Sequence, residues 1–468
     1  MAGHALTADR RAVDTVRRGT FPPGFVLGAA TSAYQVEGAW QAAGKGESIW
    51  DRFARTPGTI DDGSSGDVAC DQYHRYPEDV ALLRELGLGA YRFSISWPRI
   101  FPEPGGAVNQ RGLDHYRRLV DELLANGIEP CPTLYHWDLP TWIQDRGGWG
   151  DRQVIGELAR YAETVVGALG DRVPTWMVLN EPWIFVFLGY QLGTHAPGFR
   201  DPALALRASH ITNLALAEGV RAARAAAPAT ARIGTAVDVE AVYPASDDPL
   251  DVAAGERFHA QRNSWFLDPV LKGSYPGAFV DQDAALESMD IRPGDMEAMA
   301  TELDFIGLNM YSRAIVAHDP DGGPSAFRRV PGPGPRTTMD WEVWPAALHR
   351  IVMRYHREYG KPIYITENGC ADATAPGADG QVHDADRVAY LAGHLGQLAR
   401  AIDDGCDVRG YFAWSLMDNF EWAAGYTQRF GVVWVDFDDG LRRLVKDSGW
   451  WLRDLARTGE IDYDESLA

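Results

Sequence analysis

Residues 175–181 read TWMVLNE, a short apolar run that ends in two polar residues. Near-continuous apolar runs of this length are typical of strands that are buried on both faces. Amphipathic segments stand on both sides of the run, at 151–169 and at 202–226. A buried strand between two helices is the repeating unit of a parallel sheet covered by helices. This stretch therefore predicts an α/β fold.

The same pattern occurs eight times along the chain. The apolar runs lie at 25–35, 90–97, 129–137, 175–181, 231–238, 303–311, 362–368 and 408–418. Helical patterns separate them, among others at 76–86, 112–126, 151–169, 202–226, 344–359 and 384–403. Eight such units favour a (β/α)8 TIM barrel over an open sheet. A Rossmann fold is the competing interpretation, but no G-x-G-x-x-G motif opens a helix after the first strand.

The length of 468 residues would suggest three domains at about 150 residues each, yet α/β barrels often exceed this size as one domain. We find no internal repeat, domain linker or charge block. The sequence therefore predicts one barrel domain at 21–455, with an N-terminal tail at 1–20 and a C-terminal tail at 456–468. Long loops should cover the catalytic face. The longest irregular stretch, 318–336, follows the sixth strand and is predicted to be such a loop.

The charge of the chain excludes some partners. With 44 basic and 65 acidic residues, its formal net charge is −21. A surface of this charge repels phosphate groups, which argues against nucleic acid and anionic membranes. No apolar stretch approaches the ~18 residues of a membrane span. We therefore expect a small-molecule substrate, and the sequence leaves a homo-oligomer open.

The four cysteines, Cys70, Cys131, Cys370 and Cys406, lie far apart and form no C-x-x-C pair. This spacing is typical neither of a disulfide framework nor of a zinc ribbon. The first 20 residues contain no apolar run of ~7–15 residues, which a secretory signal would need. These features predict a reduced protein of the cytoplasm.

In a barrel, the carboxyl ends of the strands meet on one face, and polar residues there are candidates for the active site. The eight runs end, in order, with Gln35, Arg92, His136, Asn180 and Glu181, Asp238, Asn309 and Tyr311, Glu367 and Asn368, and Trp414. Glu181 and Glu367 both end otherwise apolar strands. One such carboxylate could equally be a structural acid with a buried partner. Two on the same face, beside Arg, His, Asn and Trp, favour a catalytic role.

Two facing carboxyl groups suit the cleavage of an acetal. The leaving oxygen needs a proton, and the oxocarbenium-like carbon needs a negative partner or a nucleophile. We expect Arg92 and Tyr311 to lie beside Glu367 and to keep it ionised. The charge on Glu367 would then raise the pKa of Glu181, which stays protonated as the general acid.

Motifs of other chemistries are missing. The sequence contains no H-E-x-x-H, no G-x-S-x-G and no P-loop. His136 and His195 lack a partner at metal-ligand spacing, so we expect neither a metal nor another cofactor. Cys370 is close to Glu367 in sequence, but no histidine lies nearby to activate it, which favours a packed thiol.

Six sequence blocks carry a resemblance to a known family. They are YQVEGA (34–39), YRFSISWPRI (91–100), LYHWDLP (134–140), VLNEP (178–182), ITENG (365–369) and WSLMDNFEW (414–422). Together, and in this order, they closely resemble the family 1 glycoside hydrolases, which are β-glucosidase-like retaining enzymes. A lone NEP or ENG block would be weak, but six ordered blocks at strand ends are highly specific.

The resemblance implies a role for each matching residue. Glu181 resembles the acid/base and Glu367 the nucleophile. Arg92 and Tyr311 match the positions that support the nucleophile, and Asn180 matches the one that binds the sugar 2-hydroxyl. The remaining matches imply a sugar pocket, a site for the leaving group and a rim: Gln35, His136, Trp137, Asn309, Glu421, Trp422, Trp414 as the floor, Phe430 near the sugar 6-carbon, Trp341 as the platform for the leaving group, and His195 at its rim.

Several of these residues have a simpler interpretation. Trp341, Trp414 and Trp422 could be core aromatics, and His136 could be a core imidazole with a satisfied hydrogen bond. Trp422 is harder to explain in this way, because it adjoins Glu421 and a buried carboxylate needs a partner.

Glu421 and Trp422 are the most informative residues for substrate specificity. A carboxylate near the sugar 4- and 6-hydroxyls accepts their hydrogen bonds and repels a 6-phosphate. The resemblance also places Ser and Lys in this loop in phosphoglycosidases, and neither occurs at 419–429. The sequence thus predicts an exo-acting, retaining β-glucosidase for β-glucosides and short β-gluco-oligosaccharides. A β-galactosidase, a β-fucosidase, a transglycosylating enzyme of the same family and, from a different class, a non-catalytic sugar-binding barrel remain open.

Overall fold

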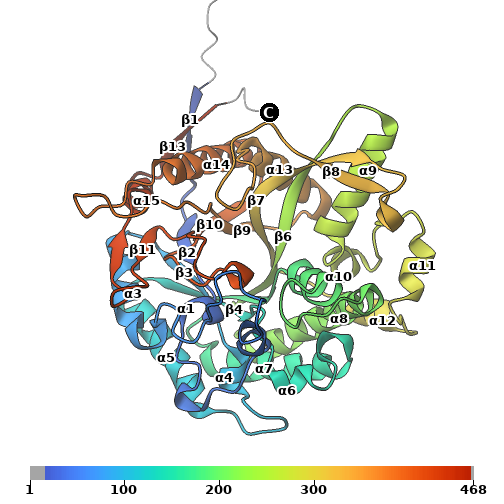
Figure 1. The fold of residues 1–468 in the computed structure, drawn as a ribbon, viewed down its shortest axis with the longest axis horizontal. Coiled ribbons are helices and arrows are strands. Elements are labelled where there is room, and N and C mark those ends of the chain that lie inside the picture. The colour runs from blue at the N-terminus through green and yellow to red at the C-terminus, as the bar shows by residue number, and fades with distance from the viewer. Residues whose placement is uncertain (1–15, 465–468) are drawn as a thin grey trace, which may run out of the picture.

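The computed structural model describes residues 16–464, and its central feature is a closed ring of parallel strands. The ring consists of β2 (Val26–Ala30), β3 (Ala90–Ser94), β4 (Glu129–Tyr135), β5 (Thr175–Asn180), β6 (Arg232–Pro244), β7 (Phe305–His318), β9 (Ile363–Asn368) and β10 (Val408–Trp414). The pairing of β10 with β2 closes it. Each strand overlaps one of the eight predicted runs. The fold is the predicted (β/α)8 TIM barrel, with its strands at the centre of Figure 1 and its helices around them.

The helices cover the outside of the ring. The longest are α3 (Gln72–Glu85), α5 (Gln110–Ala125), α7 (Gln153–Leu169), α8 (Pro202–Ala226), α13 (Ala346–Tyr359), α14 (Ala385–Asp403) and α15 (Asp447–Thr458). In α5, Leu113, Tyr116, Val120 and Leu123 are buried at the spacing of one helix face. Gly127 follows the end of α5 with a φ of 73°, a left-handed conformation that glycine adopts without steric cost.

Shorter elements fill the connections between the strands and the long helices. They are α1 (Ala33–Val36), α2 (Ile49–Ala54), α4 (Trp97–Ile100), α6 (Thr141–Gln144), α9 (Pro249–His259), α10 (Asp268–Lys272), α11 (Gln282–Glu287), α12 (Asp295–Met299), and the hairpin of β11 (Val433–Val435) with β12 (Arg443–Val445). Two π-helical turns, η3 (Ile184–Leu192) and η4 (Ala260–Ser264), follow β5 and α9.

The first strand is shorter than its sequence predicts. The apolar run at 25–35 suggested that Gln35 ends this strand, but β2 ends at Ala30 and Gln35 lies on α1. The helix starts here because Ser94 on the neighbouring strand accepts the Ala33 backbone N–H at 2.7 Å. The sequence therefore predicted the wrong element for Gln35, because the residue lies on a helix and not at the end of a strand. It still faces the site, as described below.

The barrel extends upward on one side. Strands β6 and β7 continue past the ring as a pair, with Ala241 opposite Arg313 and Pro244 opposite Val316. A further strand, β8 (Phe327–Val330), then pairs antiparallel with the end of β7. The stretch at 318–336 was predicted to be a loop, so β8 is a correction. It forms because β7 offers an unpaired edge above the barrel rim, which a returning chain can satisfy.

The two ends of the described chain meet in a small antiparallel sheet, formed by β1 (Val16–Thr20) and β13 (Glu460–Asp464). Both strands lie in segments that the sequence analysis assigns to terminal tails. These parts of the tails are thus paired with each other on the outside of the barrel (Figure 1).

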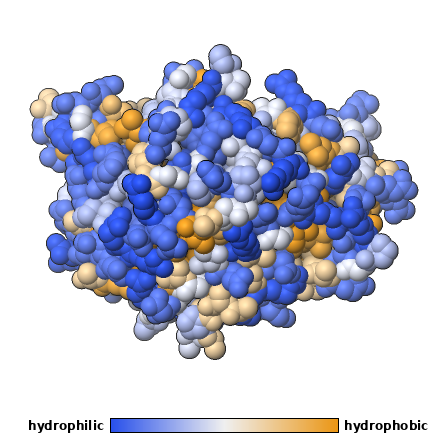
Figure 2. All heavy atoms as spheres, turned by 90° about the horizontal axis from the view of Figure 1, so that it is seen from below, coloured by the Kyte–Doolittle hydropathy of each residue, from blue (hydrophilic) through white to orange (hydrophobic). Residues whose placement is uncertain are grey.

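The surface in Figure 2 is mostly hydrophilic, with hydrophobic residues in small groups between charged ones. Within residues 16–464, none of the helices has the length and apolar character needed to cross a bilayer. The largest fully buried side chains include Trp97, Trp149, Trp176 and Trp265.

Candidate active site

A cavity of about 820 Å³ opens at the carboxyl ends of the barrel strands. Most of the predicted site residues line it: His136, Trp137, Glu181, His195, Asn309, Tyr311, Trp341, Glu367, Trp414, Glu421, Trp422 and Phe430. Gln35, Arg92 and Asn180 are buried directly behind this lining, where they hold lining residues in place. The barrel therefore brings all fifteen predicted residues to one place.

Glu367, near the end of β9, accepts hydrogen bonds on both carboxylate oxygens. Arg92 donates from Nη1 to Oε1 at 2.5 Å, and the Tyr311 hydroxyl donates to Oε2 at 2.6 Å. Arg92 is itself oriented by Asn180, whose Oδ1 accepts from Nη2 at 2.5 Å. Arg92 and Tyr311 come from β3 and β7, so closure of the ring is what places them beside Glu367, as expected from the sequence.

Glu181 follows β5 and has a different set of neighbours. Asn309 donates from Nδ2 to its Oε1 at 2.8 Å. The Asn309 amide is fixed in this orientation because its Oδ1 accepts from Thr366 at 2.6 Å. Burial first, and then the negative charge of Glu367, raise the pKa of Glu181 to about 8.

The two carboxyl groups thus differ in the state that their surroundings favour. Burial also raises the pKa of Glu367, but the Arg92 guanidinium and the Tyr311 hydroxyl oppose this rise. Within residues 16–464, Glu181 has no ion pair of this kind, and the negative charge of Glu367 raises its pKa further. Glu367 is therefore the group that ionises first, and Glu181 keeps its proton at neutral pH. Such a pair can donate a proton from one side and present a negatively charged carboxylate from the other.

A third carboxyl group, Glu421, lies in the loop after β10. Gln35 Nε2 is 3.5 Å from its Oε2 and also donates to Asn419 Oδ1 and to the Phe420 carbonyl oxygen, at 3.0 and 2.9 Å. Burial, together with the charges of Glu367 and Glu181, raises the pKa of Glu421 to about 8. A carboxylate in this position offers acceptors for the hydroxyl groups of a sugar.

Aromatic rings surround Glu421 and form the inner end of the cavity. The Trp422 ring lies 4.4 Å from that of Trp137, between centroids, and His136 lies 5.9 Å from Trp414. His136 Nε2 is 3.0 Å from Asn180 Nδ2, which leaves its other nitrogen without a hydrogen-bond partner in the part of the chain that the structure describes. Rings with a few polar groups between them are typical of sites for sugars and other amphipathic ligands.

A second aromatic group lies on the outer side of Glu367. Here Trp341 is 5.2 Å from Tyr311 and 5.9 Å from Phe430, between ring centroids. Trp341, Trp414, Trp422 and His136 all line the cavity, and Trp414 and Trp422 are at the same time buried members of the hydrophobic core. His195 also lines it, edge-on to Trp137 at 5.8 Å, and burial lowers its pKa to about 4.

Comparison with known proteins identifies the family behind this arrangement. The family model for glycosyl hydrolase family 1 matches residues 17–461. The chain belongs to glycosyl hydrolase family 1. Among its curated relatives, β-glucosidase A of Acetivibrio thermocellus is 45% identical over 94% of this chain and 98% of the relative. β-Glucosidase A of Thermotoga maritima is 44% identical over 94% and 99% of the two chains.

Solved structures of family 1 enzymes agree with this assignment. The family 1 β-glucosidase from Thermotoga maritima superposes with a TM-score of 0.91 at 43% identity and covers 95% of this chain and 99% of its own. The same enzyme in complex with deoxynojirimycin gives a TM-score of 0.90 at 43% identity, over 94% and 99% of the two chains. The barrel described above is therefore the barrel of family 1.

Three of the fifteen predicted site residues in this family 1 barrel have a left-handed backbone. They are Trp137, Glu181 and Trp422, with φ values of 77°, 50° and 49°. A conformation of this kind costs of order 1–3 kcal/mol for each residue and persists only where the surrounding structure holds it. The cost falls on Glu181 and on the rings of Trp137 and Trp422, whose side chains line the cavity.

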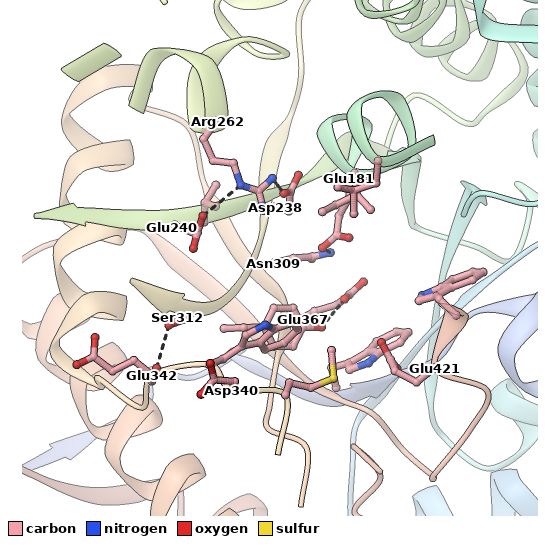
Figure 3. A pocket seen from close by; sticks show the side chains of 18 of the residues that line it. Glu181, Asp238, Glu240, Arg262, Asn309, Ser312, Asp340, Glu342, Glu367 and Glu421 are labelled. Carbon is pink, nitrogen blue, oxygen red and sulfur yellow. Dashed lines mark hydrogen bonds and ion pairs between the residues drawn. The ribbon is translucent and has the colours of Figure 1, made fainter. Parts of the chain in front are cut away.

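The outer wall of the cavity contains charged residues that the sequence analysis did not assign. Asp238 and Glu240 point inward from β6, and Arg262 reaches them from η4 (Figure 3). Arg329 pairs with Glu240 from β8. Asp238 was predicted at a strand end, but without a role in the site. The alternation in AVDVE at 236–240 was the available signal, because every second residue of a barrel strand faces inward.

Another buried ion pair holds the loop that carries Trp341. Glu342 accepts from Arg313 at 2.8 and 3.1 Å and from the Gly334 backbone N–H at 2.7 Å. The Arg313 guanidinium also lies 3.6 Å from the centre of the Trp344 ring. This loop is therefore fixed from both sides, although its sequence, rich in glycine and proline, suggested only an irregular stretch.

Proposed function

We propose that this protein is an exo-acting, retaining β-glucosidase. It would release terminal non-reducing β-D-glucosyl residues from β-glucosides and short β-gluco-oligosaccharides. The observation that carries the proposal is the pair of buried carboxyl groups with different partners. Glu367 is bound by Arg92 and Tyr311, whereas Glu181 is kept protonated by burial and by the charge of Glu367.

In the first step, a carboxylate oxygen of Glu367 forms a bond to the anomeric carbon. The bond from this carbon to the leaving oxygen breaks, and Glu181 gives its proton to that oxygen. In the second step, water gives a proton to Glu181 and its oxygen attacks the anomeric carbon. The ester bond then breaks and Glu367 recovers its charge. Two inversions leave the sugar with its original β configuration.

The change of role at Glu181 follows from its electrostatics. The charge of Glu367 is the second cause of its raised pKa, after burial. Once Glu367 is esterified this charge is absent, so the pKa of Glu181 falls. Glu181 then accepts the proton of water at the same pH at which it donated one before.

The inner end of the cavity suits one neutral hexose. Glu421 would accept hydrogen bonds from the 4- and 6-hydroxyls and repel a phosphate at the 6-position. The remaining groups would follow the roles implied by the resemblance: Gln35, His136, Trp137, Asn309, Trp422 and Phe430 around the sugar, Trp414 beneath it, Asn180 at the 2-hydroxyl, and Trp341 and His195 toward the leaving group. A contact with the 2-hydroxyl that strengthens in the transition state affects kcat more than KM.

The stereochemistry of azide products tests the two carboxyl roles. Glu367→Gly should lose hydrolysis of an activated aryl β-glucoside, and azide should restore turnover with α-glucosyl azide as the product, because azide enters from the side of Glu367. The matched variant Glu181→Ala should give β-glucosyl azide, because azide then attacks the glycosyl-enzyme from the opposite side. Hydrolysis by Glu367→Gly without azide, or exchanged products, would contradict the assignment.

A β-fucoside is the second candidate substrate. A relative from Bifidobacterium breve, 43% identical over 92% of this chain, is named a bifunctional β-D-glucosidase/β-D-fucosidase. Values of kcat/KM for aryl β-glucoside, β-galactoside and β-fucoside, with cellobiose beside them, would rank the sugars. The product ratio at high substrate concentration would separate hydrolysis from transglycosylation.

We also propose a reducing compartment, the cytoplasm. All four cysteines are free thiols and all are buried. A protein of an oxidising compartment more commonly uses such residues in disulfides. Mass spectrometry of the protein, alkylated directly in unfractionated cell extract, would test this by counting the thiols that are reduced in the cell.

A further inference from the structure

The Asp238–Arg262 ion pair stands out among the charged groups of the cavity wall, because the mechanism above does not use it. The Asp238 side chain points inward from β6, and Arg262 contacts it from η4. Only 6% of the Asp238 side chain and 14% of the Arg262 side chain are exposed. In Figure 3 the pair lies on the side of the cavity where Asn309 and Glu181 are drawn.

The pair has a direct structural connection to Glu181. Asp238 is opposite Asn309 in the register of β6 with β7, and Asn309 donates the hydrogen bond to Glu181 at 2.8 Å. The Arg262 guanidinium also lies 4.1 Å from the centre of the Trp183 ring, two residues after Glu181. A positive charge is thus held beside the acid/base without forming an ion pair with it.

The position of Arg262 is fixed by its own turn. The neighbouring Asn263 side chain accepts the Glu240 backbone N–H at 3.0 Å and donates to the Glu240 carbonyl oxygen at 2.8 Å. These two hydrogen bonds tie η4 to β6. Arg262 Nε is also 3.4 Å from Glu240 Oε2, and Arg329 neutralises Glu240 through two hydrogen bonds. Arg262 and Asp238 are therefore left as partners for each other.

We propose that Asp238 and Arg262 are positioning residues for the reaction: together they set the pH range in which Glu181 holds the proton that the leaving group needs. The inference rests on the proposed role of Glu181 as acid/base. The physical basis is that the charge of Arg262 favours the ionised form of Glu181, in opposition to burial and to Glu367. Asp238 offsets part of that charge. The pKa of Glu181 is therefore lowered less than it would be by Arg262 alone.

Other groups also face Glu181, and none of them is replaced in variants of this pair. They are Glu367 from β9, Arg92 from β3, Asn309 and Tyr311 from β7, His136 from β4, and Glu421 from the loop after β10. A difference between variants of the pair can therefore be assigned to the pair itself.

The test is the alkaline limb of kcat/KM for a β-glucoside with a poor leaving group, such as a methyl or alkyl glucoside. In Asp238→Asn the charge of Arg262 is no longer offset and lowers the pKa of Glu181 further, so the alkaline limb should move to lower pH. Arg262→Gln removes the positive charge, so the limb should move to higher pH. Each shift should be about one pH unit, since a charge at ~4–6 Å changes a pKa by ~1–3 units. The double variant should return close to the wild-type limb.

Opposite shifts distinguish this role from a structural one, because damage to the fold would lower activity in both variants without moving the limb in opposite directions. Arg336→Gln is the matched control: it removes a guanidinium that lines the same cavity, but one that pairs with Asp340, and should not move the limb. With 2,4-dinitrophenyl β-glucoside, whose leaving group needs no proton, the differences should disappear. Unchanged limbs, or shifts in one direction, in variants with wild-type circular dichroism would overturn the inference. The azide products of Glu181→Ala decide the role of Glu181 separately.

Discussion

The inner and outer halves of the cavity are built in different ways. The inner half consists of strand ends and the loop after β10, with Glu421 among the rings of Trp137, Trp422 and Trp414. The outer half consists of the extensions of β6 and β7, strand β8 and the turn η4, with ion pairs along its wall. A single acceptor among rings suits one fixed sugar. In the outer wall the charged side chains are paired with each other. Such a wall suits a role in setting the protonation of Glu181, and it can accept substrates with varied leaving groups.

This difference predicts that changes in the inner half weaken all substrates alike. Glu421→Gln should lower kcat/KM by about 5- to 150-fold, because it replaces an acceptor oxygen with an amide donor and leaves a buried sugar hydroxyl without its partner, which costs ~1–3 kcal/mol. The loss should be the same for aryl and alkyl β-glucosides. It should shrink for a 6-deoxy-β-glucoside, which lacks one of the partners. A loss that depends on the leaving group would contradict the separation of the two halves.

The pH dependence sharpens the same comparison. The pKa of Glu181 is raised to about 8, so its proton is present below this pH and is lost as pH rises through it. For a poor leaving group, kcat/KM should fall by about tenfold per pH unit above that point. For 2,4-dinitrophenyl β-glucoside the alkaline fall should be absent. Initial rates between pH 5 and pH 10 would measure both, and equal limbs for the two substrates would argue against Glu181 as the acid.

The smallest expected effect lies in the outer half. Glu342→Gln weakens the hold of Arg313 on the loop that carries Trp341. We expect KM for an aryl β-glucoside to rise about fivefold, which corresponds to ~1 kcal/mol, while KM for methyl β-glucoside stays unchanged. Glu256→Gln is the matched control, because Glu256 pairs with Arg354 away from the cavity. Equal effects on both substrates would indicate a general change in stability.

Much of the fold could be predicted because its signals are local. Apolar runs and helical periodicity located the eight ring strands and the long helices except α15, since burial on both faces of a strand and on one face of a helix leaves a direct pattern. Strand β8 was missed because its four residues have no such pattern. It exists only because the edge of β7 is unpaired above the barrel. Gln35 was placed on the wrong element because an apolar run does not say where a strand stops.

The residues of the candidate site likewise fall into two groups, those that the sequence could predict and those that it could not. Glu181, Glu367 and the residues around the sugar follow strand ends or ordered motifs, so their numbers could be given in advance. Arg262 could not, because its distance from β6 in sequence carries no signal and only the π-helical turn η4 directs it toward Asp238.

By itself, the sequence determined the barrel, the family and the two candidate carboxyl groups, because each depends on residue type and order along the chain. It also predicted that Glu181 keeps its proton, but only the tertiary structure placed the groups on which this outcome depends. That depends on distances across the ring: Arg92 from β3 and Tyr311 from β7 bind Glu367, while Asn309 and the charge of Glu367 act on Glu181. Electrostatic effects depend on separation in space, which closure of the barrel sets.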